Sequence, residues 1–222
     1  ISKLGNIKDI KGRTLKSIVS NKGTLKANGG IVQLSAADAQ YLSRGTVNLS
    51  QSGKIYARNV GNKSGRIVIG GPNNQSINLA GTLDASSRYQ IQAQNKNSVV
   101  SISGGDIKLK GNIYAKNHKT KSVNIKARGN LELNNKIIAS GNKFGGEIML
   151  SSENSTVKSP SSYLDVSGGF KGGRITSSSK TTNMSSGGLN ASSASGYGGV
   201  VDLVGSKIIV KKASIKGQGK KH

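Results

Sequence analysis

The chain has 222 residues, with 33 Lys and Arg against 9 Asp and Glu, a formal net charge of +24 and only 4% aromatic residues. So few rings disfavour a large globular core, and the absence of cysteine excludes disulfides and thiolate metal sites. No run of about 18 apolar residues is present to form a membrane-spanning helix, and the first residues show no signal-peptide pattern. We expect the chain to be a fragment of a larger protein.

A short apolar phrase recurs along the chain. It reads G-T-L-K-A at 23–27, G-K-I-Y-A at 53–57, G-T-L-D-A at 81–85 and G-N-I-Y-A at 111–115, and it continues more loosely at 136–141, 163–168 and 188–192. Steps of about 24 to 30 residues are typical of one supersecondary unit per repeat. The repeat therefore indicates a single elongated unit rather than two globules.

Each repeat holds three short segments of alternating apolar residues. They are residues 24–27, 31–34 and 46–49 in the first unit, 54–57, 66–69 and 76–79 in the second, and 112–115, 122–125 and 130–133 in the fourth. Alternation buries one face of each strand, and no segment shows helical spacing. We predict an all-β fold, a parallel β-helix (solenoid) of about seven coils of three short strands, stacked ~4.8 Å apart.

Equivalent positions are expected to stack inside this solenoid. One interior column holds Leu25, Ile55, Leu83, Ile113, Ile137, Leu164 and Leu189, and a narrow corner column holds Ala27, Ala57, Ala85, Ala115, Ala139, Val166 and Ala191. We expect an extra strand in the third unit and looser packing over 151–195, where Ser177 occupies an inward position. The expected division is an irregular leading coil (1–20), repeat coils (21–210) and a basic tail (211–222).

Three longer phrases carry a family resemblance. N-K-G-T-L-K-A-N-G-G-I-V-Q-L-S-A at 21–36, V-N-L-S-Q-S-G-K-I-Y-A at 47–57 and I-A-S-G-N-K-F-G-G-E-I-M-L at 138–150 resemble the filamentous haemagglutinin-like exoproteins of bacterial two-partner secretion. The resemblance implies a right-handed parallel β-helix and export through an outer-membrane β-barrel partner. It also implies a secreted or cell-surface location, as an adhesin that contacts a host or neighbouring cell, or as the stalk of a contact-dependent toxin.

Basic residues gather in two stretches of the sequence. The first stretch, 108–128, contains no acid, and its cations are Lys108, Lys110, Lys116, Lys119, Lys121, Lys126 and Arg128; the second contains Lys207, Lys211, Lys212 and Lys216. Clustered cations attract polyanions by counterion release, so sulfated glycans, lipopolysaccharide phosphates and nucleic acid are candidate ligands. The alternative is that these lysines keep strand edges and flat sheet faces from aggregating.

Two tyrosines form a second candidate surface. Tyr56 and Tyr114 occupy the same outward position two coils apart, which separates them by roughly 10 Å. A sugar could stack on them, or they could be ordinary surface residues of a strand.

No catalytic or metal-binding set is found in the sequence. Asp84 and Asp165 share an outward position but lie three coils apart, near ~14 Å, whereas glycoside hydrolysis needs carboxylates about 5 to 9.5 Å apart. His118 lies in a lysine-rich turn, where it is expected to be solvated. We predict a non-enzymatic adhesin segment without catalytic residues, cofactor, metal, small-molecule substrate or membrane insertion. A toxin-delivery stalk and a β-helical polysaccharide-degrading enzyme are the alternatives.

Overall fold

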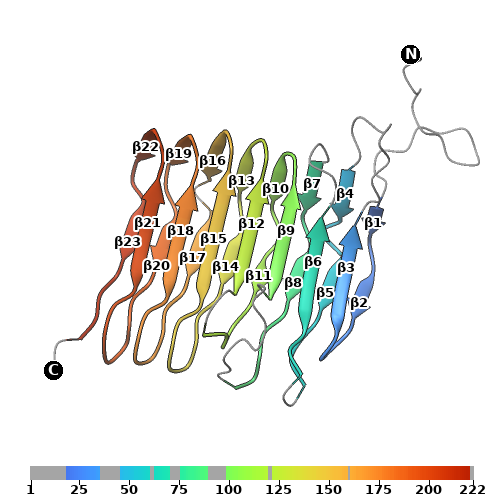
Figure 1. The fold of residues 1–222 in the computed structure, drawn as a ribbon, viewed down its shortest axis with the longest axis horizontal. Coiled ribbons are helices and arrows are strands. Elements are labelled where there is room, and N and C mark those ends of the chain that lie inside the picture. Colours follow the sequence, from blue (N-terminus) through green and yellow to red (C-terminus); the bar gives the residue numbers. More distant parts are fainter. Residues whose placement is uncertain are drawn as a thin grey trace, which may run out of the picture.

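The structure is a computed structural model that describes residues 19–35, 46–60, 63–70, 76–89, 99–119, 122–159 and 161–220. Within these ranges the chain winds repeatedly through three sheets, each made of parallel strands, as Figure 1 shows. The predicted all-β parallel β-helix is thereby confirmed. None of the described residues belongs to a helix long and apolar enough to cross a lipid bilayer.

The three sheets take their strands in strict rotation. The first sheet contains β1 (Val19–Asn21), β4 (Thr46–Leu49), β7 (Ser76–Leu79), β10 (Ile107–Leu109), β13 (Leu131–Leu133), β16 (Ser155–Lys158), β19 (Thr181–Met184) and β22 (Lys207–Val210). The second contains β2 (Thr24–Lys26), β5 (Lys54–Tyr56), β8 (Thr82–Asp84), β11 (Ile113–Tyr114), β14 (Lys136–Ile138), β17 (Tyr163–Asp165), β20 (Gly188–Asn190) and β23 (Ser214–Lys216). The third contains β3 (Ile31–Ser35), β6 (Arg66–Gly70), β9 (Val100–Gly104), β12 (Val123–Ala127), β15 (Glu147–Ser152), β18 (Arg174–Ser178) and β21 (Val200–Val204).

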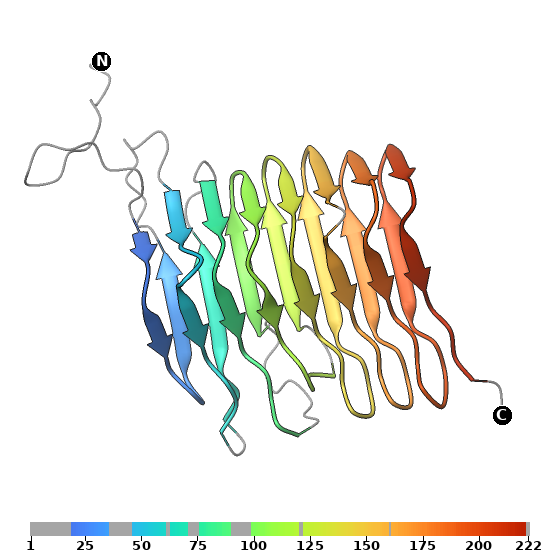
Figure 2. The same cartoon turned by 180° about the vertical axis from the view of Figure 1, so that it is seen from behind.

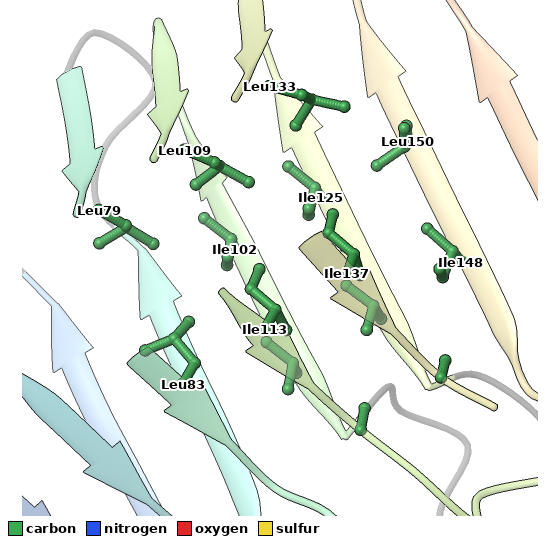
Figure 3. Close-up of a cluster of buried hydrophobic side chains, with 14 of the residues drawn as sticks. Leu79, Leu83, Ile102, Leu109, Ile113, Ile125, Leu133, Ile137, Ile148 and Leu150 are labelled. Carbon is green, nitrogen blue, oxygen red and sulfur yellow. The ribbon is translucent and has the colours of Figure 1, made fainter. Parts of the chain in front are cut away.

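Equivalent apolar residues stack in register inside the coil, as predicted. Leu83 pairs with Ile113, and Ile113 pairs with Ile137, so that the column from Leu25 to Leu189 runs from β2 to β20, and Ile215 continues it in β23. Figure 3 shows these side chains beside those of the third sheet, such as Ile125. Burial of each Leu or Ile stabilises the folded state by about 1.5 to 3 kcal/mol. A single coil cannot bury these side chains without its neighbours, so it would not gain this stabilisation alone.

The interior becomes polar in the coils built from β15 to β20. Thr156 and Thr182 replace aliphatic residues in one column of the first sheet, and Ser177 occupies an inward position in the third sheet, as predicted. Within the described part of the chain, the buried Ser177 hydroxyl has no hydrogen-bond partner. These substitutions remove apolar contacts that the neighbouring coils retain.

Lys158 is the most unusual of these inward residues. Its side chain is 2% exposed and lies between Leu133 and Met184 in the register of the first sheet. The ammonium donates one hydrogen bond, 3.2 Å long, to the carbonyl oxygen of Gly188. Burial lowers the pKa of Lys158 from its ordinary value of 10.5 to about 8, because a charge is costly to remove from water.

Two expectations about the coils need correction. The third unit has no extra strand in its described residues: its two apolar segments are β9 and β10, which belong to different sheets. The segment assigned to a basic tail contains β23, which pairs with β20, so repeat coils extend beyond residue 210. Residues 1–18 of the predicted leading coil lie outside the described residues, and β1 already pairs with β4.

The inward and outward register can be tested with two neighbouring residues. Ile113 is 1% exposed, whereas Tyr114 points outward. We expect Ile113→Asp to lower the free energy of unfolding by about 4 kcal/mol or more, because it buries an unpaired charge, and Tyr114→Ser to change it by about 0.5 kcal/mol or less. Urea unfolding of both variants measures the difference. Equal effects would contradict the register.

The buried lysine predicts a stability gain. We expect Lys158→Met to raise the free energy of unfolding at pH 7 by about 2 to 3 kcal/mol, since methionine fills similar volume without a charge to desolvate. The unfolded chain holds the Lys158 proton more tightly than the folded chain, so raising the pH from about 8 towards 10.5 stabilises the natural protein and shrinks this gain.

The matched control is Lys136→Met, which removes an exposed charge from the second sheet. This variant measures how much the free energy of unfolding changes when the large net positive charge of the chain is reduced by one. A Lys158→Met gain no larger than that of Lys136→Met, or one that grows with pH, would contradict the assignment.

Candidate functional site

The loops that lead from the second sheet to the third lie side by side along one edge of the solenoid. Their described residues are 27–30, 57–60, 63–65, 85–89, 99, 115–119, 122, 139–146, 166–173 and 191–199, and we call them the loop edge. Figures 1 and 2 show these loops projecting below the sheets. Surface loops held by a rigid scaffold are where binding residues commonly lie.

Paired glycines allow successive loops to stack closely. The sequences Phe-Gly-Gly at 144–146, Lys-Gly-Gly at 171–173 and Tyr-Gly-Gly at 197–199 align through bridges between their first residues. A Cβ on Gly145 would lie 1.8 Å from the Val166 oxygen, and one on Gly172 would lie 1.9 Å from the Ala191 oxygen. Only glycine permits this approach of backbone to backbone.

The loop edge is basic and contains no acid. Seven exposed cations lie in its described residues, namely Arg58, Lys63, Arg88, Lys116, Lys119, Lys143 and Lys171. The same residues include no Asp or Glu. Because stacked coils bring these loops together, cations that are far apart in sequence create one positive strip.

A first pocket of about 480 Å³ opens near the N-terminal end of this strip. Asp84 accepts two hydrogen bonds from Arg58, 2.8 Å from Nε and 2.5 Å from Nη2. Arg88, Tyr114 and Lys116 also line the pocket. Two cations and a ring thus surround a space whose only carboxylate already binds Arg58.

An aromatic ladder lies farther along the loop edge. The rings of Phe144 and Phe170 meet edge to face with centroids 6.2 Å apart, and Phe170 meets Tyr197 in the same way at 6.2 Å. Phe170 is 51% exposed and Tyr197 is 71% exposed. The Lys119 ammonium lies 4.8 Å from the centre of the Phe144 ring. The aligned Phe-Gly-Gly and Tyr-Gly-Gly motifs place Phe144 and Tyr197 in one column, but the register places Lys171 between them, so the sequence did not predict the contact with Phe170.

Two shallow pockets lie along the same loops as the ladder. One, of about 540 Å³, is lined mainly by small polar residues at the starts of the loops, among them Asn117, Ser140 and Asn142. The other, of about 330 Å³, is lined by Phe144, the glycine pairs and the charged residues Lys119, Glu147, Lys171 and Arg174. Hydroxyl and amide groups therefore predominate in the first of these pockets, and three cations with one carboxylate line the second.

The predicted basic cluster at 108–128 does not form one face. Lys108 and Lys126 project from the first and third sheets, Lys110 follows β10 and Arg128 follows β12, while Lys116 and Lys119 lie on the loop edge; Lys121 lies outside the described residues. A coil contains about two dozen residues, so such a stretch circles the solenoid almost once. Lys108 pairs with Glu132 at 3.2 Å.

The second predicted group surrounds the last coil. Lys207 lies on the first sheet, Lys211 and Lys212 lie in the turn before β23, and Lys216 lies on the second sheet. These four exposed cations therefore point in different directions at one end of the described structure.

Tyr56 and Tyr114 occupy the same outward column, as predicted, but Asp84 lies between them in the register. Arg58 stacks on Tyr56 at 5.1 Å, and Lys116 lies 5.8 Å from the centre of Tyr114. Both rings are partly buried, so the pair offers less free aromatic surface than the ladder.

The titratable residues that could support catalysis are dispersed. Asp84 and Asp165 are three strands apart in one column, as predicted, and the strand pairings place no two described carboxylates at adjacent positions. No group of three or more His, Asp or Glu among the described residues could hold a metal ion.

His118 differs from the expected solvated turn residue. It is fully buried, with its Nε2 atom 2.8 Å from the Ala85 oxygen, and its Nδ1 atom has no hydrogen-bond partner among the described residues. Burial lowers its pKa, which keeps the ring neutral near pH 7. The loop folds this side chain back over the preceding coil, a long-range contact that local composition does not reveal.

The fold and the edge together define the class of protein, a parallel β-solenoid with a basic, partly aromatic loop edge. Comparison with protein families, with curated proteins and with solved structures finds no match for this chain. The function is therefore inferred from the geometry and from the resemblance of the repeat phrases.

The close stacking of the loops can be tested by adding single methyl groups. We expect Gly172→Ala to destabilise the fold by about 1 to 3 kcal/mol, because its Cβ would meet backbone that cannot move without shifting a coil. Gly23→Ala is the control, since its Cβ would lie 4.0 Å from the nearest atom, Asn21 Oδ1. Thermal unfolding of both variants measures the effect, and equal melting temperatures would contradict the packing described.

Proposed function

We propose that the chain is a non-enzymatic rod segment of a large secreted or surface-exposed bacterial adhesin of the filamentous haemagglutinin-like kind, and that its loop edge contacts polyanionic glycans. One observation carries the proposal: seven exposed cations lie along one edge whose described loops contain no Asp or Glu. The full protein is proposed to leave the cell through an outer-membrane β-barrel partner.

The repetitive geometry supports an adhesive function. Coils spaced ~4.8 Å apart present similar groups at a regular step along the rod. A polymeric ligand can then make several weak contacts at once, and these contacts combine through high effective concentration. Such binding needs neither a deep pocket nor a reactive residue.

The dispersion of carboxylates supports a non-enzymatic function. Glu132 and Asp202 each bind a cation, at 3.2 Å to Lys108 and 2.5 Å to Arg174, and Asp84 is held by Arg58. A polysaccharide-degrading enzyme would need two acids that converge on one bond. A toxin-delivery stalk shares the rod but needs no ligand, so ligand binding separates it from the adhesin.

The proposal predicts salt-sensitive binding to a sulfated glycan. We expect the chain to be retained on heparin and to elute at moderate salt, and Lys119→Gln/Lys171→Gln to elute earlier. Each lost contact should reduce the slope of log K against log salt by up to about one. Heparin chromatography and titration at several salt concentrations measure both effects.

A matched pair controls for net charge. Lys22→Gln/Lys180→Gln also removes two exposed cations, but from turns on the two other edges. Equal losses for the two double variants would show that total charge, rather than the loop edge, determines retention. No retention of the natural chain would contradict the polyanion proposal and favour the stalk.

A further inference from the structure

We propose that Phe144, Phe170 and Tyr197 form a platform on which an extended acidic polysaccharide lies along the rod axis, with its sugar rings following successive coils. This inference rests on the proposed function and specifies it, because it names the saccharide rings as the recognised feature. The aromatic residues proposed to contact sugar are therefore those of the ladder on the loop edge, in place of Tyr56 and Tyr114.

The exposure of the ladder is the first argument. Phe170 and Tyr197 are 51% and 71% exposed, in a chain with only 2 Phe and 6 Tyr. Contiguous apolar surface on a soluble protein commonly marks an interaction site. Edge-to-face contacts between the rings are worth about 0.5 to 1.5 kcal/mol each, but they do not require so much of each ring to face solvent.

The spacing of the ladder is the second argument. Its three rings come from three successive loops, and the 6.2 Å centroid distances exceed the coil step of ~4.8 Å because neighbouring rings meet edge to face. A pyranose unit advances a polysaccharide by a length close to one coil step. Successive sugars can therefore reach successive rings, which stand nearly perpendicular to one another, without bending the polysaccharide chain.

The groups around the rings indicate the chemistry of the ligand. Asn142, Ser140 and Ser167 line the polar pocket and supply donors and acceptors suited to sugar hydroxyls. Lys119 and Lys171 line the other pocket together with Arg174 and Glu147, and the excess of positive charge there favours a carboxylate or sulfate substituent. Rings, hydroxyl-binding groups and cations on one edge fit an acidic polysaccharide better than a polyanion without sugar rings.

The test compares two polyanions on the complete chain. The probes are hyaluronan, a polymer of uronic acid and amino sugar units, and inorganic polyphosphate, which has charge but no rings. We expect Phe170→Ala/Tyr197→Ala to weaken hyaluronan binding by at least about tenfold, since two ring contacts are lost, and to leave polyphosphate binding within about twofold. Biolayer interferometry at fixed salt measures both affinities.

Two further variants guard against a merely structural effect. Phe170→Tyr/Tyr197→Phe keeps both rings and should keep hyaluronan affinity. Tyr163→Ala removes an aromatic ring from the second sheet in the same coil as Phe170 and should change neither affinity. Circular dichroism establishes that each variant retains its β structure.

The outcomes separate this inference from the broader proposal. Equal losses for both polymers, or no loss for hyaluronan, would overturn the platform. Binding of polyphosphate without binding of hyaluronan would overturn the platform and leave the basic edge intact. If the natural chain binds neither polymer, the platform is overturned, and retention on heparin decides the broader proposal.

Discussion

In-register parallel pairing between each coil and the next is the constraint on which the rest of the structure depends. It forces the residue one repeat later to occupy the same environment, so a buried aliphatic residue at Leu83 requires one at Ile113 and another at Ile137. No coil buries its apolar side chains without its neighbours, and stability is therefore collective. The regular spacing of apolar residues in the sequence follows from this need to stack like side chains in successive coils.

The same pairing determines which surface residues can act together. Residues one repeat apart become neighbours, whereas residues a third of a repeat apart lie on different sheets. Lys108 and Lys126 are close in sequence but project from different faces, while Lys119, Phe144 and Lys171 meet on one edge. A polymeric ligand that follows the rod axis would contact residues from many repeats but few from any one of them.

The solenoid separates the demands of stability from those of binding. Strands of the three sheets supply the apolar columns, and the loop edge depends mainly on backbone stacking through glycines such as Gly145 and Gly172. Side chains on the loops can therefore be substituted without removing apolar contacts from the core. The interior also tolerates polar substitutions, because the strands that contain Lys158 and Ser177 still pair in full although these residues reduce apolar packing.

The sequence by itself determined the fold, because alternation and a repeat of two dozen or more residues specify strand faces and stacking partners. It identified the columns from Leu25 and from Ala27, the inward position of Ser177 and the separation of Asp84 from Asp165. It did not locate the basic edge, the aromatic ladder or the burial of His118. Those depend on how far each loop extends and how it turns, which is decided by contacts between loops a full repeat apart. The composition of one loop does not predict its contacts with the next loop, so only the tertiary structure shows that Phe144, Phe170 and Tyr197 meet.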